Sequence, residues 1–397
     1  MGAISGMGTT YNLPNYTGLL YQLTPTDTPF FSAIGGLSGG GQSSSTEFEW
    51  QTTDLRSAAQ PAIVEGADAP SAIGRTRDNV TNVCQIHQSQ ISVSYTKLAA
   101  VGQKAGSNND LTNPVRNELD FQTQAELISM VRDIEFSFIN GAYQKPSDNT
   151  TARRTRGLLA AIATNTTDWG VTVSANTLTV AAATDLVAET STPLANGDQI
   201  LIRQITGGAP LAVNTVYFVV EKATNAFKLS LTKGGPAINV TADGSAIGYT
   251  RLTPLTYDMI NAHLQSVYDN GGIMQSETAA LMVPSHLKVA VSKALADVYG
   301  KYNESSRTVG GVDMTTVITD FGTLNVITNR HMPKGTLAVV SLDQCMPVYL
   351  EVPGKGHFFA EPLARTGAAE RVQLYGEVGL AYGNERAHGK LTNVGSA

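Results

Sequence analysis

The chain has little of several features that define common protein classes. Only two of its 397 residues are cysteines, Cys84 and Cys345, so a disulfide framework is excluded and both are expected to be buried free thiols. The formal net charge is −6, and no basic stripe of the kind used by dedicated nucleic-acid-binding proteins is present. No stretch approaches the run of about 18 apolar residues that a membrane helix needs, so no membrane is expected among the partners. Met1–Tyr21 lacks the basic n-region and the apolar run of a signal peptide, which favours synthesis in a cytoplasm.

Motifs for catalysis or metal binding are equally scarce. Asp320–Gly322 (DFG) matches the metal-binding tripeptide of protein kinases, but the other kinase motifs are missing, so a turn between two strands is expected. Gly354–Gly356 (GKG) lacks the first glycine and the Ser/Thr of a phosphate loop and predicts a loop with a positive tip. Neither the isolated histidines nor the cysteines have companions at metal-ligand spacing. The sequence therefore predicts no enzyme, no cofactor and no metal site.

The chain does have enough apolar residues for packed cores and many residues suited to turns. Hydrophobic residues make up 42% of it, charged residues 15%, and there are 38 glycines. Disorder needs low hydrophobicity together with high net charge, which this composition does not show. At 397 residues the chain exceeds a comfortable single core, so several domains are expected, rich in strands and turns.

Residues 1–44 predict an irregular N-terminal arm. Three prolines and two glycine clusters exclude long helices and central strands from it. Apolar side chains are nevertheless scattered along the arm, Phe30 and Phe31 among them. Exposed apolar surface of this kind is a liability on a monomer, so we expect the arm to lie along another surface.

Residues 45–106 predict an extended β-hairpin loop. In its returning limb, apolar and polar positions alternate with period two, the apolar ones being Ile86, Ile91, Val93 and Tyr95. The polar stretch between the limbs carries the charged side chains of Glu65, Asp68, Arg75 and Arg77. A two-stranded ribbon is marginal alone in water, so this one needs a partner.

A long amphipathic helix is predicted over Pro114–Tyr143, within the segment 107–164. Asn113 is the expected N-cap, and Pro114 suits the first turn. The predicted apolar stripe consists of Val115, Leu119, Ile128, Val131, Ile134 and Phe138. Three arginines follow at 153, 154 and 156. They are either a solvated helix end, partners of Asp or Glu on a neighbour, or contacts to a polyanion.

The segment 165–252 changes character, because short strands alternate there with turn dipeptides. This spacing predicts a small sandwich or barrel whose ends lie close together, as in a domain inserted into a loop. Its strands are expected at Thr177–Val180, Gln199–Ile205, Val216–Glu221, Ala226–Ser230 and Ala237–Val240. Residues 253–397 then predict helices near Pro254–Tyr268 and Ser285–Tyr299 with a mostly antiparallel sheet. The fold class is therefore α+β.

The order of these parts resembles the major capsid proteins of tailed bacteriophages, which have the Hong Kong 97-type fold. The segments that carry the resemblance are Leu23–Phe31 (LTPTDTPFF), Thr319–Leu324 (TDFGTL), Asn329–Pro333 (NRHMP), Glu361–Ala364 (EPLA) and Asn384–Gly389 (NERAHG). Each is short, and their order along the chain is the stronger argument.

The resemblance implies a division of the chain into named parts. These are an N-terminal arm (1–44), an extended loop (45–106), a spine helix with peripheral domain (107–164), an inserted all-β domain (165–252), and an axial domain with the closing peripheral sheet (253–397). It also implies a protein that self-assembles as hexamers and pentamers into the icosahedral head shell around double-stranded DNA. The implied partners are portal and scaffolding proteins, a cement or decoration protein, and non-specifically bound DNA. Assembly is expected in the host cytoplasm.

Contacts between subunits are expected from residues of the arm, the loop tip and the positive loop, namely Phe30, Phe31, Glu65, Asp68, Arg75, Arg77 and Lys355. Some relatives weld their subunits by a Lys–Asn isopeptide bond from the extended loop. The only lysine between Thr46 and Gly102 is Lys97, near the base of the returning limb, so no such cross-link is expected. No long charged scaffolding segment precedes the arm, so the assembly guide is expected to be a separate protein or a removed segment.

Two alternatives stay open. An encapsulin-like compartment shell protein has the same fold with a different cargo. A carbohydrate-binding virion surface protein would need a glycan site in 165–252, where Trp169, Tyr217, Phe218 and Phe227 are few for an aromatic platform.

Overall fold

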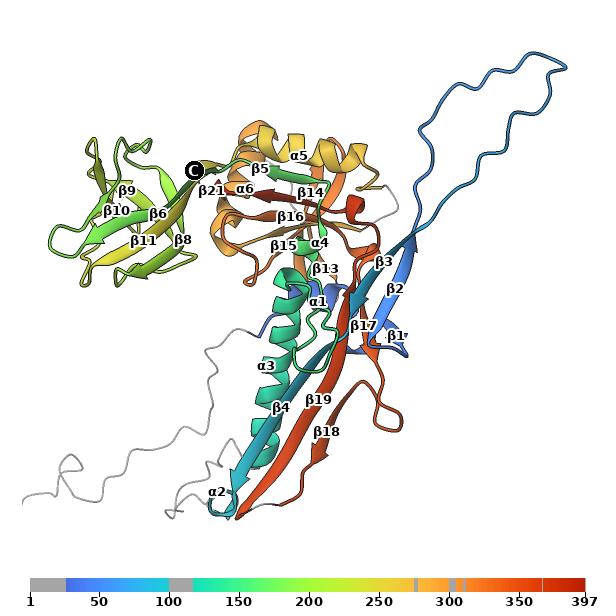
Figure 1. Cartoon of the computed structure of the whole chain (residues 1–397), viewed down its shortest axis with the longest axis horizontal. Coiled ribbons are helices and arrows are strands. Elements are labelled where there is room, and N and C mark those ends of the chain that lie inside the picture. The colour runs from blue at the N-terminus through green and yellow to red at the C-terminus, as the bar shows by residue number, and fades with distance from the viewer. Residues whose placement is uncertain are drawn as a thin grey trace, which may run out of the picture. The chain divides into compact units, whose positions relative to one another are not determined.

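Strands dominate the computed structural model of the chain, which describes residues 26–99, 117–274, 278–299, 305–309, 312–365 and 367–396 (Figure 1). Most of the predicted arm, together with Asn113, Pro114 and Val115, lies outside these residues. The chain divides into two compact units. The first draws on the segments His87–Asp133 and Val352–Gly376, and the second on Thr28–Ile86, Ile134–Glu351 and Glu377–Ala397. No helix among the described residues is long and apolar enough to span a bilayer.

The first unit packs one end of a helix against long strands. Its elements are β4 (Gln85–Ser94), α2 (Tyr95–Ala99), the start of α3 (Glu118–Asn140), β18 (Phe358–Pro362) and the start of β19 (Ala369–Ala381). β4 and β18 both pair with β19. The buried side chains of Ile91, Val93, Met130 and Leu374 form the core of this unit.

The alternation predicted for the returning limb is present, but two residues of the set, Ile86 and Tyr95, were wrong. Burial along β4 falls on His87, Ile91 and Val93, with exposed residues between them. Ile86 is 44% exposed, because the buried face of the strand begins at His87. Tyr95, at the end of the predicted alternation, lies in α2 rather than in the strand.

The long helix is confirmed, with different ends. Asn117 caps it, since its Oδ1 accepts hydrogen bonds from the backbone nitrogens of Leu119 (3.0 Å) and Asp120 (3.4 Å). The helix ends at Asn140, and the carbonyl oxygen of the next residue, Gly141, accepts a hydrogen bond from Gly157 N at 2.9 Å. Ile134 and Phe138 of the predicted stripe are fully buried, whereas Ile128 is 37% exposed. The stripe passes instead through Leu127 and Met130, which pack in the core of the first unit.

The second unit contains an α/β part built on one sheet. In spatial order its strands are β13 (Ser305–Val309), β14 (Val312–Thr319), β15 (Gly322–Thr328), β12 (Ala279–Val283), β16 (Leu337–Ser341), β20 (Gly389–Thr392) and β5 (Thr166–Asp168). Four of the six pairings are antiparallel, as predicted. The two-residue turn between β14 and β15 is formed by Asp320 and Phe321, which confirms the turn expected at the DFG tripeptide.

Two helices pack on this sheet. α5 (Tyr257–Asp269) begins after Thr256, whose side chain accepts from the nitrogen of Met259, and α6 (Ser285–Tyr299) has the predicted bounds. Apolar side chains from both helices and from the sheet share one core. The short elements η2 (Leu342–Gln344) and η3 (Glu385–Ala387) lie before and after the strand β19 in the sequence.

The segment 165–252 contributes a closed β-barrel. Its strands are β6 (Val171–Ala181), β7 (Leu186–Ala188), β8 (Gln199–Gly207), β9 (Val216–Val220), β10 (Ala226–Ser230) and β11 (Gly244–Pro254). They pair in the cyclic order β11-β6-β7-β10-β9-β8, and β8 returns to β11, so the ring has no free edge (Figure 1). Every side chain of its core comes from residues 178–249. The entering and leaving strands lie side by side, since Val171 pairs with Arg251.

Two strands of the barrel were missed and one prediction was wrong. β7 is only three residues long, and β11 has a run of glycine and small residues that hides its alternation. Ala237–Val240 is not a strand; its nitrogens donate singly to different segments, Ile238 N to Leu229 O at 2.8 Å and Val240 N to Asp185 Oδ1 at 2.7 Å. The C-terminal strand β21 (Val394–Gly395) adds to β11 in parallel where β11 leaves the barrel.

Most of the remaining elements lie near the start of the described chain. α1 (Pro29–Ala33), η1 (Gly36–Ser38) and β1 (Gly41–Ser43) follow one another, and β1 pairs in parallel with β17 (Met346–Leu350). β17 continues the sheet to the end of β19. β2 (Glu47–Thr52) and β3 (Asp78–Val83) form an antiparallel ribbon, and α4 (Leu158–Ala161) is a single turn.

Candidate functional site

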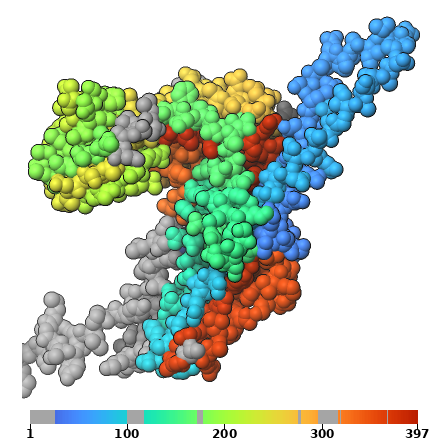
Figure 2. Space-filling view, viewed as in Figure 1, coloured from blue at the N-terminus to red at the C-terminus, as the bar shows by residue number. Residues whose placement is uncertain are grey.

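The residues between β2 and β3 form a long loop that the chain leaves unburied. Every residue from 53 to 77 is exposed, and none of them is in a helix or strand. The loop carries four large apolar side chains with exposed fractions of 86% (Leu55), 60% (Ile63), 81% (Val64) and 76% (Ile73). Figure 2 shows it as a thin limb, coloured blue. Apolar groups gathered on such a limb mark a surface that is made for a partner.

The four charged residues predicted at the tip all lie on this loop and point into solvent. Glu65, Asp68, Arg75 and Arg77 are exposed, and none has an ion-pair partner within the described ranges. Together with Asp54 and Arg56, these residues give the loop three acidic and three basic groups beside its apolar side chains.

The other predicted contact residues have different surroundings. Lys355 belongs to the first unit, at the tip of a tight loop between Val352 and Gly356, as the glycine pattern indicated. Its ammonium group forms an ion pair with Glu361 and lies 5.2 Å from the ring centre of Phe359.

Phe30 and Phe31 require a correction. Their exposed fractions are 0% and 1%, and the ring of Phe31 packs edge-on against Phe138 at 5.7 Å. The short helix α1 directs both rings into the core of their own chain. These side chains are thus unavailable to a neighbouring subunit.

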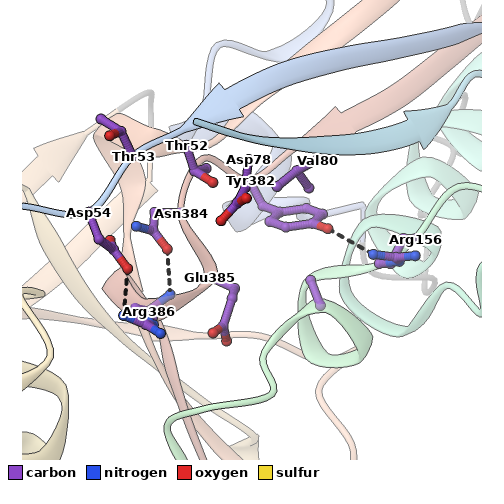
Figure 3. A pocket seen from close by; sticks show the side chains of 11 residues that line it. Thr52, Thr53, Asp54, Asp78, Val80, Arg156, Tyr382, Asn384, Glu385 and Arg386 are labelled. Atoms are coloured by element: carbon purple, nitrogen blue, oxygen red, sulfur yellow. Dashed lines mark hydrogen bonds and ion pairs between the residues drawn. The ribbon is translucent and has the colours of Figure 1, made fainter. Parts of the chain in front are cut away.

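A polar pocket lies at the base of the loop (Figure 3). Its volume is about 310 Å³, and it is lined by Thr52, Thr53, Asp54, Asp78, Val80, Arg156, Ala161, Tyr382, Asn384, Glu385 and Arg386. Arg386 Nη1 donates to Asp54 Oδ2 at 2.6 Å, and on the other side Arg156 Nη1 donates to the Tyr382 hydroxyl at 3.1 Å. None of these residues was singled out from the sequence as a pocket residue. One feature of the sequence could have indicated that a face of the ribbon packs on the rest of the chain, namely the period-two spacing of Phe48 and Trp50 in β2.

The carboxylate of Glu385 in this pocket stays ionised. Burial alone would raise its pKa, but hydrogen bonds from the Thr164 side chain, Thr164 N and Ala163 N, together with Arg386, lower the pKa below its ordinary value. A carboxylate held in this way accepts hydrogen bonds and is a poor general acid. The pocket is therefore suited to structural contacts.

Among the described residues, Cys345 and His388 are a pair to be weighed for catalysis. Cys345 Sγ lies 4.0 Å from His388 Nε2. However, Ser341 N donates to Nδ1 at 3.2 Å, so the ring proton is on Nε2, which donates to Tyr382 O at 2.7 Å. Burial also raises the pKa of the Cys345 thiol. The imidazole thus has no lone pair directed at a thiol that itself stays protonated, and the pair has no nucleophile.

Two of the three arginines that follow the long helix have side-chain contacts inside the second unit. Arg153 pairs with Glu377 at 2.9 Å, and the guanidinium of Arg156 lies 4.4 Å above the ring of Tyr143. Arg154 is exposed. Cys84, like Cys345, is a buried free thiol, as expected. No cluster of three His, Cys, Asp or Glu that could hold a metal occurs in the part of the chain that the structure describes.

Comparison with known proteins gives the fold and the family. The solved capsid of cyanophage A-1(L) matches with a TM-score of 0.56 and 11% identity over 98% of this chain and 99% of that one. The holo-SrpI encapsulin of Synechococcus elongatus (11% identity, 96% and 92% covered) and the capsid of cyanophage P-SCSP1u (11% identity, 100% and 99% covered) each have a TM-score of 0.49. No curated protein matches the sequence.

The likeness to the A-1(L) capsid establishes the α+β Hong Kong 97-type fold. The family comparison reaches further, because it covers nearly the whole sequence. The model of the SU10 major capsid protein matches residues 3–395. The chain therefore belongs to the SU10 major capsid protein family.

Proposed function

We propose that copies of this major capsid protein assemble as hexamers and pentamers into the icosahedral head shell of a tailed bacteriophage, around double-stranded DNA. The observation that carries the proposal is the loop 53–77, on which Leu55, Ile63, Val64 and Ile73 are left exposed by their own chain. A subunit of a shell has neighbours that can cover such a loop, whereas a monomer does not.

Apolar burial is the main source of stability in this proposal. Removing apolar area from water contributes about 25 cal/mol per Å². Exposed ion pairs contribute only about 0–1 kcal/mol each, so Glu65, Asp68, Arg75 and Arg77 mainly select the docking position. Lys355 is a further candidate contact from the first unit, although part of its charge is already used by Glu361.

The shell is held together without covalent links between subunits. Lys97 lies in α2, outside the loop 53–77, and forms an ion pair with Glu118 at 3.6 Å. The loop itself contains no lysine. Particles boiled in detergent should therefore release a single band of about 42 kDa, the mass of one chain being 41.9 kDa. A ladder of larger bands would contradict this.

The further partners follow from the same role. A scaffolding protein guides assembly, a portal occupies one vertex, a decoration protein binds outside, and DNA contacts the inner surface without sequence preference. Assembly takes place in the host cytoplasm. The residues 165–252, folded as a closed barrel with its own core, form a domain inserted into the shell fold.

Negative-stain electron microscopy with light scattering tests the proposal. The protein is expressed alone and together with its neighbouring genes. Closed shells, or hexamers and pentamers that become shells with a scaffold, are the expected result. A persistent monomer under both conditions would overturn the proposal.

A further inference from the structure

The ribbon that carries the loop is fastened along one face to the chain's C-terminal segment. Side chains of a strand alternate between its two faces, so Phe48 and Trp50 of β2 share a face, which Asp54 continues beyond the strand end. A Cβ on Gly379 would lie 2.6 Å from the Phe48 ring, so the glycine lets the ring approach the backbone. Trp50 Nε1 donates to Gly383 O at 2.7 Å.

Aromatic contacts also hold the ribbon against this C-terminal segment. The ring of Trp50 stacks on Phe48 at 5.9 Å and meets the ring of Tyr382 edge-on at 4.9 Å. Such pairs contribute about 0.5–1.5 kcal/mol beyond the area they bury. The ribbon, which as two strands would be marginal alone, is thereby held in one orientation.

The second strand of the ribbon is fixed by a buried amide. Asn82 on β3 is fully buried. Its Nδ2 donates to Leu380 O at 2.7 Å and to Arg156 O at 3.2 Å, and its Oδ1 accepts from Arg156 N at 2.8 Å. Both strands therefore rest on residues 379–386 and on the segment around Arg156.

The outermost fastening is the ion pair of Asp54 and Arg386. The pocket of about 310 Å³ is lined by the strand ends and by Tyr382 and Asn384, and the Asp54–Arg386 pair lies at one side of it (Figure 3). Beyond Asp54, the hydrogen bonds of the described loop join residues of the loop itself, such as that from Ala67 N to Val64 O at 3.1 Å. The direction of the loop is thus decided at its base.

We propose that Trp50 and Arg386 are positioning residues for assembly, which fix the direction in which the ribbon presents the loop 53–77 to the next subunit. This inference rests on the proposed function. Leverage is the physical reason. An extended limb of about a dozen residues reaches roughly 40 Å, so a tilt of about 10° at the base displaces the tip by about 7 Å. A displacement of that size would take the loop's apolar side chains off their target.

Charge exchange within the pair tests the role of Arg386. The single variants Asp54→Arg and Arg386→Asp each place like charges together, and each should lower the yield of closed shells at least about fivefold. The double variant Asp54→Arg/Arg386→Asp should restore the yield. The Glu221–Lys228 pair on the barrel, 2.8 Å apart, is the matched control. Its single charge reversals should leave shell yield unchanged.

Mixing experiments separate positioning from a direct contact between subunits. If the pair acts inside one chain, mixing the two single variants should not restore shell yield. Each copy then still has two like charges at the base of its own loop. Restored assembly in the mixture would show that Asp54 meets Arg386 of a neighbour and would overturn the proposal.

Trp50→Phe tests the second residue with little risk to folding. It keeps an aromatic ring but removes the donor to Gly383 O. Hydrogen exchange of the β2 and β3 amides in the unassembled subunit should accelerate severalfold while the thermal midpoint stays close to that of the parent. Shell yield should fall in parallel. Unchanged exchange and yield in all variants would refute the inference, whereas failure of the parent chain itself to assemble would refute the proposed function instead.

Discussion

The backbone nitrogen of Phe31 lies 2.6 Å from Glu135 Oε2, and this contact joins the short helix α1 to the long helix α3. Glu135 is fully buried. Its other oxygen, Oε1, accepts from Phe30 N at 3.0 Å and from the side-chain amide of Asn329. One carboxylate thus connects three segments that are far apart in the sequence, at the point where the described chain enters the fold.

Replacing this carboxylate by an amide should destabilise the subunit. In Glu135→Gln, one oxygen becomes an NH₂ group that must face a backbone or side-chain donor, so at least one buried hydrogen bond is lost. Hydrogen bonds to charged groups contribute about 1.5–3 kcal/mol, and we expect a loss of about 2 kcal/mol in the free energy of unfolding. Urea unfolding of the unassembled chain measures it. Asp133→Asn, at an exposed position of the same helix, is the control and should change stability by less than about 0.5 kcal/mol.

A second prediction concerns the close backbone contact at the end of α3. A Cβ on Gly157 would lie 2.4 Å from Gly141 N and 2.9 Å from Ile139 O. Backbone atoms cannot move aside as a flexible side chain would, so Gly157→Ala should cost at least about 1–3 kcal/mol of folding stability. Gly74→Ala adds the same methyl group where no atom lies within 4 Å and should be neutral. Equal thermal midpoints for the two variants would contradict the close packing.

A third prediction is a loss of stability in acid that depends on His263. This imidazole on α5 is 3% exposed, and burial lowers its pKa to about 4 from the ordinary 6.5. Between these two values the unfolded chain binds a proton that the folded chain does not, so stability falls as the pH is lowered from 6.5 to 4. One pKa unit corresponds to 1.36 kcal/mol, which gives a contribution of about 3 kcal/mol.

The variant His263→Gln isolates this contribution. Burial also lowers the pKa of His87 and of His286 to about 4, so the parent chain loses stability in the same window for several reasons. The difference between the parent and the variant should shrink by about 3 kcal/mol between pH 7 and pH 4, as measured by urea unfolding of the unassembled subunit. A constant difference across that range would show that His263 titrates normally.

Much of the fold could be predicted because its elements repeat with regular periods. The stripe along α3, the helix expected near Ser285–Tyr299 and the turn at Asp320–Phe321 gave the right elements. The errors arose where local pattern and tertiary contact disagree. His87 is buried in β4 in place of Ile86, since the register of the sheet decides which face is covered. β7 was missed because three residues carry too little pattern.

The candidate site was predictable only in part, for a physical reason. An exposed loop shows itself by polar composition, so Glu65, Asp68, Arg75 and Arg77 could be placed on it from the sequence. Its base is formed by residues about 330 positions apart, as the partners Trp50 and Gly383 show. No local pattern encodes such a pairing. Phe30 and Phe31 were predicted to contact a neighbouring subunit, but they are buried in their own chain. Sequence alone cannot tell whether an apolar side chain packs in the core of its own chain or against another subunit.

The last prediction separates folding from assembly on the loop itself. Ile63 and Val64 are 60% and 81% exposed, so Ile63→Ser/Val64→Ser should leave the unfolding of the isolated subunit unchanged. Burying such a side chain fully contributes about 1.5–3 kcal/mol, so the critical concentration for shell formation should rise at least about tenfold, as followed by light scattering. Leu231→Ser, at a side chain of the barrel that is 64% exposed, is the control and should assemble like the parent chain. If the loop variant also assembles at the parent's concentration, these side chains are not buried between subunits, and the apolar part of the loop has another role.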